Sequence, residues 1–511
     1  MTTMQKIASA LLLLLAACGD NVGDGAIDDT PGEGGVEVRA AGPTVRVRVG
    51  DAEELAVSIE RTGEFVGPVT VSLADLPDGV TAAPVELGPE DTDAALLVEA
   101  ADGADQGIFD VRLEAVADED AAIADAAGLR ATIAGLPGSI DPSLGDDGIT
   151  LLDPAPGLDG SVRDAIIDAQ GRIVVIGYTQ NEDITLDGWI TRFSPDGAHE
   201  EDFGEGGYLT DFGADESQGR RLLPAGDGFH ALVYRYADID EDGKQDTVIR
   251  RYLGDGSLDE GYGEDGEVIT AVLYPERDVA LRGDGVVVHN SIDIEAFDGD
   301  GEPVEFTEIK AYADVSRADD DGRTVVAMSD GVDGPWMLGR VTADGGLDED
   351  FGDDGYQTYP QPVGHEQAYI NDLVLAADGS GFAAASSQYD QDDFLAQGAV
   401  LAFAADGAPV AGFGDGGHLV VEETDGYAMR VLLDGHGGLI VLVVRDLGGD
   451  ERDTVVRRYA AADGALDETF GDGGELLLEH DSYVMRIDAD GRLVVVGGLY
   501  DGTIAIQRIW L

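Results

Sequence analysis

Short runs in which apolar and polar residues alternate fill residues 36–136, and no helical period interrupts them. The clearest runs are "TVRVRVG", "LAVSIER", "VTVSLADLP", "FDVRLEAVA" and "LRATIAGLP". In the first run Val45, Val47 and Val49 share one face and arginines occupy the other, as a half-buried strand requires. Five or more such strands within about 100 residues predict a β-sandwich.

One stretch of this region carries a family resemblance. "GPVTVSLADLPDGVTAAP", Gly67 to Pro84, resembles the Ig-like modules of bacterial surface proteins, in which a "GPVT…LP.GV" phrase is common. The resemblance covers this domain alone and implies an Ig-like sandwich that serves as a spacer or an adhesive stalk. The stretch "DEDAAIADAAG", Asp118 to Gly128, is expected to form an acidic loop, with a short helix as the alternative.

A ten-residue phrase recurs through the rest of the chain. Its copies are "SIDPSLGDDG", "AHEEDFGEGG", "SLDEGYGEDG", "GLDEDFGDDG", "APVAGFGDGG" and "ALDETFGDGG". We call this phrase the marker; with the residue that precedes it, its consensus is G-x-L-D-x-x-F-G-x-x-G. Its F-G glycines are spaced by 59, 59, 89, 62 and 57 residues. A period near 60 is too long for one hairpin and suits a four-stranded unit. The glycines permit turns with positive φ, Asp caps its own backbone, and the aromatic ring is expected to plug between neighbouring units.

Between the markers lie seven glycine-led apolar runs. They are "GRIVVIGY", "GFHALVYR", "GVVVHNS", "GRTVVAMS", "GFAAASS", "GLIVLVVR" and "GRLVVVGG". Continuous apolar runs predict strands buried on both faces. The interval of 89 residues contains one such run, from Gly285, so one unit has lost its marker. Seven units over residues 149–511, 363 residues in all, average about 52 residues each, which suits the blades of a β-propeller.

The fold class predicted from these patterns is all-β: an Ig-like sandwich followed by a propeller of seven blades, with six as the alternative. The first marker, at Ser139, precedes the first unit, and the last unit ends at Leu511 without a marker. The N-terminal marker is therefore expected to complete the junction between the last and first blades and close the ring. The alternative is that this segment is a linker. The marker and its period resemble the delta-sixty repeat family over residues 137–511, which implies a propeller-like β-repeat on an exported protein and no particular reaction.

The N-terminus predicts export. An apolar run from Ile7 to Ala17 follows Lys6 and is too short to span a bilayer. Its end, "LAAC", resembles the lipobox of bacterial lipoproteins, so residues 1–18 are expected to be a signal peptide whose Cys18 carries the lipid that anchors the protein at the cell envelope. The alternative is a plain signal peptide with an incidental thiol. Cys18 is the single cysteine of the sequence, so no intrachain disulfide forms.

Residues 19–35 are acidic and glycine-rich and predict a flexible tether, followed by the sandwich over residues 36–136 and the propeller over 137–511.

The charge of the chain limits the kinds of molecule that it is expected to bind. The chain has 30 basic and 104 acidic residues, a net charge of −74. Such a surface repels nucleic acid and anionic lipid and favours cations and basic partners, although solubility alone is the simpler interpretation.

One acidic loop has metal-ligand spacing. "DIDEDGKQD" matches D-x-D-x-D-G-x-x-D and resembles the calcium loop of integrin-type propeller blades, with alternating carboxylates and a glycine at the bend. An EF-hand fits less well, because Ile249 stands at the twelfth position. Calcium is therefore the one cofactor expected, and a solvated acidic hairpin tip is the alternative. The candidate ligands are Asp238, Asp240, Asp242 and Asp246.

Catalytic motifs are missing from the sequence. The seven histidines form no HxH or HExxH pair, and no G-x-S-x-G, P-loop or dinucleotide-binding phrase occurs in the required setting. No catalytic residue and no small-molecule cofactor is assigned. With 104 acidic residues, close carboxylate pairs are too common to be informative. The three tryptophans are expected to pack within blades rather than to form a glycan-stacking platform.

Three functions follow from these patterns. The favoured hypothesis is a lipid-anchored envelope protein that acts as a binding or adhesion scaffold, with a protein or glycan as ligand. The alternatives are an envelope glycan hydrolase or lyase that uses carboxylates at the propeller mouth, and a passive spacer. Arg, His, Tyr and carboxylates converging at the mouth would favour the enzyme, an exposed aromatic or acidic groove would favour binding, and glycine with small apolar residues would favour the spacer.

Overall fold

The computed structural model describes residues 35–154, 159–181, 185–214, 216–236, 245–272, 278–290, 294–306, 312–319, 321–329, 335–360, 367–388, 396–422, 426–448, 451–478, 480–499 and 502–511. Throughout these residues every regular element is a strand, so the predicted all-β class is confirmed. None of them forms an apolar helix of membrane-spanning length.

The N-terminal domain is a sandwich of two sheets. One sheet has the order β1 (Gly35–Ala40), β3 (Ala52–Thr62), β7 (Asp93–Ala100), β5 (Val80–Ala82). The other has the order β2 (Thr44–Arg48), β9 (Ala124–Ala134), β8 (Gly107–Ala117), β4 (Val69–Ala74), β6 (Val85–Leu87). The alternating residues form one core, which includes Val47, Val71 and Val98. The stretch from Asp118 was expected to be an acidic loop, but β9 begins at Ala124, so the second half of that stretch is strand.

The remaining strands form four-stranded antiparallel sheets, seven of them within the described residues. We number them 1 to 7 along the chain. Sheet 1 consists of β11 (Asp159–Ile167), β12 (Ile173–Gln180), β13 (Leu186–Phe193) and β14 (Tyr208–Leu209). Sheet 2 consists of β15 (Glu216–Ala225), β16 (Gly228–Tyr236), β17 (Gln245–Tyr252) and β18 (Glu267–Thr270). Sheet 3 consists of β19 (Asp278–Arg282), β20 (Gly285–His289), β21 (Ile294–Phe297) and β22 (Pro303–Val304).

Sheets 4 to 7 continue the series. Sheet 4 consists of β23 (Tyr312–Ala318), β24 (Thr324–Ser329), β25 (Trp336–Val341) and β26 (Tyr356–Tyr359), and sheet 5 of β27 (Gln367–Leu375), β28 (Gly381–Gln388), β29 (Ala396–Phe403) and β30 (His418–Glu422). Sheet 6 consists of β31 (Gly426–Leu433), β32 (Gly438–Gly448), β33 (Glu451–Ala460) and β34 (Glu475–Leu478). Sheet 7 consists of β35 (Asp481–Ile487), β36 (Arg492–Gly498), β37 (Ile504–Trp510) and β10 (Ile149–Leu152).

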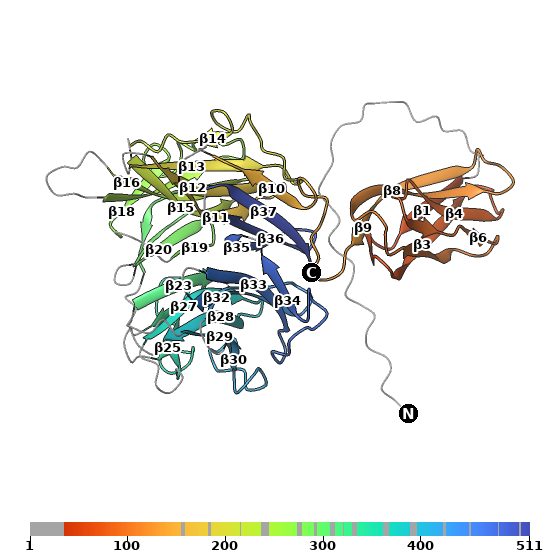
Figure 1. The fold of residues 1–511 in the computed structure, drawn as a ribbon. Helices are drawn as coiled ribbons and strands as arrows, with labels where there is room; N and C mark the ends of the chain where they lie inside the picture. Colours follow the sequence, from red (N-terminus) through yellow and green to blue (C-terminus); the bar gives the residue numbers. More distant parts are fainter. Residues whose placement is uncertain are drawn as a thin grey trace.

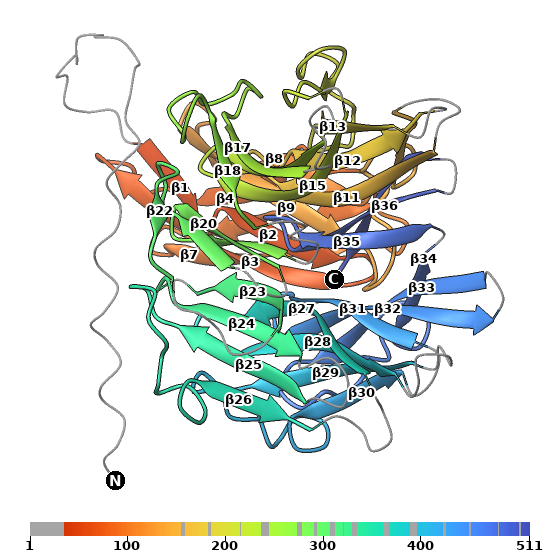
Figure 2. The ribbon, with the colours of Figure 1, turned by 90° about the vertical axis from the view of Figure 1, so that its left-hand side faces the viewer.

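The seven sheets are arranged around an axis in a propeller-like body (Figures 1 and 2). The first strand of each sheet contacts the first strand of the next, in the circle β11, β15, β19, β23, β27, β31, β35 and back to β11. The second strand of a sheet lies between two strands of its own sheet and two neighbouring sheets. Strand β24 is therefore buried along its whole length, as the continuous apolar run predicted.

The N-terminal marker closes this circle. Strand β10 follows the marker and pairs antiparallel with β37, from Ile149 opposite Gln507 to Leu152 opposite Ile504. The outer strand of sheet 7 thus comes from the N-terminal side of the chain. The expectation that this segment joins the last unit to the first is confirmed, and the linker alternative is wrong. Sheet 7 therefore combines one strand from the beginning of the repeat region with three strands from its end.

The markers are interlocking joints between sheets. In sheet 4 the marker carboxylate of Asp348 accepts a hydrogen bond from Arg340 on the third strand at 2.7 Å, and the guanidinium lies 4.7 Å from the ring centre of Phe351. The backbone N–H of Gly352 donates to the carbonyl of Asp406 in sheet 5 at 2.7 Å. The Phe351 ring packs beneath Gly407, where a Cβ would lie 2.8 Å from the ring. The predicted role of the aromatic residue as a plug between units is confirmed at this joint.

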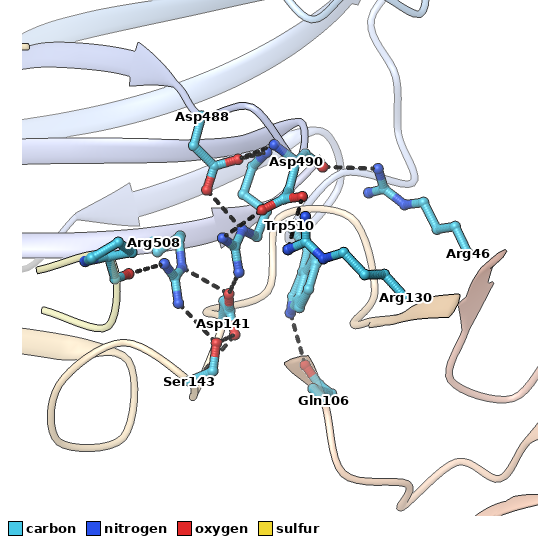
Figure 3. A network of polar contacts seen from close by, with 11 residues as sticks. Arg46, Gln106, Arg130, Asp141, Ser143, Asp488, Asp490, Arg508 and Trp510 are labelled. Carbon is cyan, nitrogen blue, oxygen red and sulfur yellow. Dashed lines mark hydrogen bonds and ion pairs between the residues drawn. The ribbon is translucent and has the colours of Figure 1, made fainter. Parts of the chain in front are cut away.

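The sandwich docks on sheet 7 beside the C-terminus (Figures 1 and 3). Arg46 donates to the carbonyl of Asp490 at 3.3 Å, and Arg130 forms an ion pair with the Asp490 carboxylate at 3.6 Å. The indole N–H of Trp510 donates to Gln106 at 2.9 Å. These contacts attach one sheet of the sandwich, through β2, β9 and the residue before β8, to the end of the propeller-like body. Trp510 is completely buried, and it packs at this junction rather than within a blade alone.

Candidate functional site

The structure leaves the predicted calcium loop largely untested. Cys18, Asp238, Asp240 and Asp242 lie outside the described residues. Asp246 is described at the start of β17, where its carboxylate lies 3.9 Å from the guanidinium of Arg235. The described residues contain no cluster of three or more His, Cys, Asp or Glu side chains able to hold a metal. Lipidation at Cys18 and calcium binding at the loop therefore stay predictions.

A cavity of about 430 Å³ lies on the axis of the propeller-like body. It is lined by residues of the seven inner strands, most of them aliphatic. Its charged lining residues are Arg221, Arg317, Arg430, Arg486, Asp164 and Asp372. Four arginines and two aspartates give the lining a formal charge of +2, whereas the whole chain carries −74. Each arginine comes from a different sheet, so the ring gathers a net positive charge at its axis in a chain whose overall charge is strongly negative.

Backbone irregularities bring these side chains to the axis. The pairing of the first and second strands shifts register by one residue in six of the seven sheets, and in five of these six the first residue after the shift lines the cavity. A bulge of this kind re-aims the side chain that follows it. Four of the residues placed in this way are charged, namely Asp164, Arg221, Asp372 and Arg430, and the fifth is Val315.

The two aspartates are fully engaged with their surroundings. Asp164 accepts hydrogen bonds from the backbone N–H of Leu222 at 3.0 Å and from Arg486 at 2.7 Å. Asp372 accepts from the backbone N–H of Val431 at 3.1 Å and from Arg317 at 2.8 Å. Each carboxylate thus ties its sheet to the next one and holds one arginine in position. Both oxygens of each carboxylate therefore already accept a hydrogen bond from the protein.

The other two arginines of the lining, Arg221 and Arg430, repel each other electrostatically. Arg430 donates to the carbonyls of Met429 at 2.9 Å and Asn371 at 3.4 Å. Burial lowers the pKa of the Arg430 guanidinium, Asp372 opposes this effect, and the nearby positive charges of Arg221 and Arg486 lower the pKa further. The repulsion between these guanidinium groups is an unfavourable energy that a bound anion would relieve.

The lining agrees with only part of the pattern expected for an enzyme. Arginines and carboxylates converge, but the lining contains no His and no Tyr among the described residues. It is also unlike a spacer, because charged and long aliphatic side chains occupy it. Sequence reasoning missed the four arginines. Their signal was present in the strands that precede the central runs, in "QGRRLLP", "ADVSRAD", "YAMRVLL" and "YVMRIDA", in a chain with only 30 basic residues.

Comparison with known proteins gives no family. No family model matches the sequence, and no curated protein matches it. Solved structures with some likeness include a gluconolactonase from Xanthomonas campestris, XC5397 (14% identity, 46% of this chain and 86% of that chain, TM-score 0.22), and a protein described as a putative gluconolactonase (10%, 73% and 97%, 0.29). The tricorn protease is another (10%, 89% and 44%, 0.39). At these values the likeness carries no argument about activity.

Proposed function

We propose that this protein is an exported, lipid-anchored module of the bacterial cell envelope that binds an anionic group of its ligand in the axial cavity of a seven-bladed propeller. The observation that carries the proposal is the convergence of four arginines on one cavity in a chain of net charge −74. Arginine is the side chain best suited to carboxylates and phosphates, because its planar donors match their oxygens.

The architecture supports display of this cavity away from the membrane. In the proposal, residues 1–18 are the signal that ends at Cys18, residues 19–35 are the tether, and the sandwich over 36–136 is an Ig-like stalk. The seven four-stranded sheets support seven blades over six. The contacts of Arg46, Arg130 and Trp510 fix the stalk to the propeller (Figure 3).

The binding hypothesis is favoured over the glycan hydrolase or lyase. A glycosidase needs two carboxyl groups free to act as acid, base or nucleophile. Asp164 and Asp372 instead accept hydrogen bonds from backbone N–H groups and from arginines. The ligand class that fits is an envelope glycan bearing carboxylate or phosphate, and no histidine or tyrosine lines the cavity among the described residues.

Titration of the purified protein with uronic acids tests the proposal. The wild-type chain should bind glucuronic acid and not glucose, and binding should weaken with added salt. Arg430→Gln should lower the affinity about 10-fold or more, since a hydrogen bond to a charged group contributes about 1.5–3 kcal/mol. Arg39→Gln, at an arginine that is 69% exposed, is the control and should change nothing. Equal binding of glucose, or full affinity in Arg430→Gln, would reject the proposal.

A further inference from the structure

A second hollow, of about 410 Å³, lies at the junction of sheets 2 and 3. His230, Arg251 and Asp259 line it, and Pro224 and Leu281 form part of both this wall and that of the axial cavity. The two cavities therefore adjoin.

Shortened hairpins create this hollow. In sheets 2 and 3 the first two strands are joined by two residues, since Ala225 pairs with Gly228 and Arg282 pairs with Gly285. The other hairpins are longer. In sheet 1, for example, Asp168 begins the turn and binds the side chain of Arg172 at 2.6 Å. Because sheets 2 and 3 are neighbours and both lack this turn, the space between their ends is left open.

The hollow contains a histidine where four other repeats have an aliphatic residue. His230 stands opposite Arg251, the arginine that pairs with the marker Asp259. The residues opposite the corresponding arginines in sheets 1, 4, 6 and 7 are Val174, Val325, Ile440 and Val494. His230 is 2% exposed, and neither of its ring nitrogens has a hydrogen-bond partner among the described residues.

The marker next to His230 also has a polar residue at a position that is apolar in the other markers. Its aromatic residue is Tyr262, whereas the other aromatic markers have phenylalanine. The Tyr262 hydroxyl also lacks a partner among the described residues, and its ring centre lies 5.0 Å from that of His230. Leaving a buried polar group unpaired is costly. Two unpaired polar groups lie at this joint, and one of them, His230, is on the wall of the hollow, so the hollow is suited to a ligand.

The surroundings define the chemistry of that ligand. Burial, and then the charge of Arg251, lower the pKa of His230 to about 4, so the imidazole is neutral and offers one donor and one acceptor. A hydroxyl group matches both. Asp227, Asp259 and Asp284 line the hollow and repel an anion, while Leu281 supplies an apolar surface. These features fit an uncharged sugar ring, with hydroxyls at its edge and C–H groups on its face.

We infer that the hollow is a second subsite, which binds a neutral sugar unit of the same ligand whose acidic group lies among the axial arginines. This inference rests on the proposed function. The ligand is then an acidic oligosaccharide in which a uronic acid is linked to a neutral hexose.

Calorimetry with three probes tests the subsite: an aldobiouronic acid (glucuronic acid linked to a hexose), glucuronic acid, and a neutral disaccharide. The full-length wild-type protein should bind the aldobiouronic acid at least 10-fold more tightly than glucuronic acid. His230→Val, which installs the residue found at the equivalent position of sheets 1, 4 and 7, should abolish this difference and leave the affinity for glucuronic acid unchanged. Tyr262→Phe should reduce the difference, and His436→Val, at an exposed histidine, should preserve it.

The outcomes separate the two proposals. If His230→Val keeps the 10-fold preference, an ordered water satisfies the imidazole and the subsite is refuted. If glucuronic acid does not bind the wild-type chain, the axial site is refuted. The subsite is then supported only if the wild-type chain binds the neutral disaccharide and His230→Val does not. Should that variant fail to fold, Tyr262→Phe decides: an unchanged preference in it overturns the inference.

Discussion

Replacing Asp141 with alanine should open the ring. This carboxylate lies in the N-terminal marker and is completely buried. It accepts hydrogen bonds from Arg492 at 2.9 Å and from Arg508 at 2.8 Å, and it caps the backbone N–H of Ser143 at 3.0 Å (Figure 3). Its loss leaves the buried Arg508 without a carboxylate among the described residues, while Arg492 keeps Asp488 at 2.8 Å.

The expected loss of stability follows from these partners. Removing one member of a buried ion pair costs about 3–5 kcal/mol, because the other charge stays buried and uncompensated. Since Arg492 retains a second carboxylate, we expect about 3–4 kcal/mol for Asp141→Ala. Glu37→Ala is the control. It removes an ion pair in which Glu37 and Arg39 are 51% and 69% exposed, and such surface pairs contribute about 0–1 kcal/mol.

Urea denaturation followed by tryptophan fluorescence measures this difference. Trp510 is buried at the closure, with the Arg492 guanidinium 5.7 Å from its ring centre, so its emission reports on this junction. Asp348→Ala, which breaks the corresponding pair at an internal joint, shows how much of the effect belongs to any joint and how much to closure. A loss below about 1 kcal/mol in Asp141→Ala, equal to that of Glu37→Ala, would refute the argument that this carboxylate holds the ring shut.

Three further outcomes are expected. The pKa of His230 is lowered from 6.5 to about 4 in the folded protein, so the unfolded chain binds a proton that the folded protein does not bind. The free energy of unfolding of the wild type should therefore fall by about 3 kcal/mol as the pH drops from 6.5 to 4, whereas that of His230→Val should lack this contribution. A stability difference between the two proteins that stays constant over this pH range contradicts the prediction. Cys18→Ser should release the protein from membranes on fractionation, and unchanged retention contradicts lipidation. Calcium should raise the melting temperature of wild type but not of Asp240→Ala; no rise at millimolar calcium contradicts the metal site.

The repeated architecture was accessible from sequence because its determinants are local. A strand buried on both faces requires a continuous apolar run, and a tight turn requires glycine, so each unit can be recognised from its own stretch of about 60 residues. Even the degenerate third unit was found, since its central run from Gly285 survives although its marker does not. The closure by β10 followed from the position of one extra marker at the start of the series.

The axial site was not accessible in this way, because it depends on register. Whether Arg430 points to the axis or into a sheet interface is decided by one extra residue in β31, between Ala428 and Arg430. A one-residue shift reverses the direction of every later side chain. Nothing in the local run of apolar residues specifies that shift. The ion pair between Asp164 and Arg486 joins residues 322 positions apart and depends on ring closure as well.

The repeats supply an internal standard by which functional residues can be separated from structural ones. At the joints the same chemistry returns: Arg340 with Asp348, and Arg251 with Asp259, each pair at 2.7 Å. Positions under purely structural demand should keep to that pattern, because each joint must meet the same geometry. The positions after the bulges do not, since Asp164, Arg221 and Val315 occupy them in sheets 1, 2 and 4. His230 does not either, because its ring nitrogens are unpaired where its counterparts are apolar. Since such a departure lowers stability, it persists where binding gains from it. The residues that break the repeat are therefore those on which the ligand-binding experiments should concentrate.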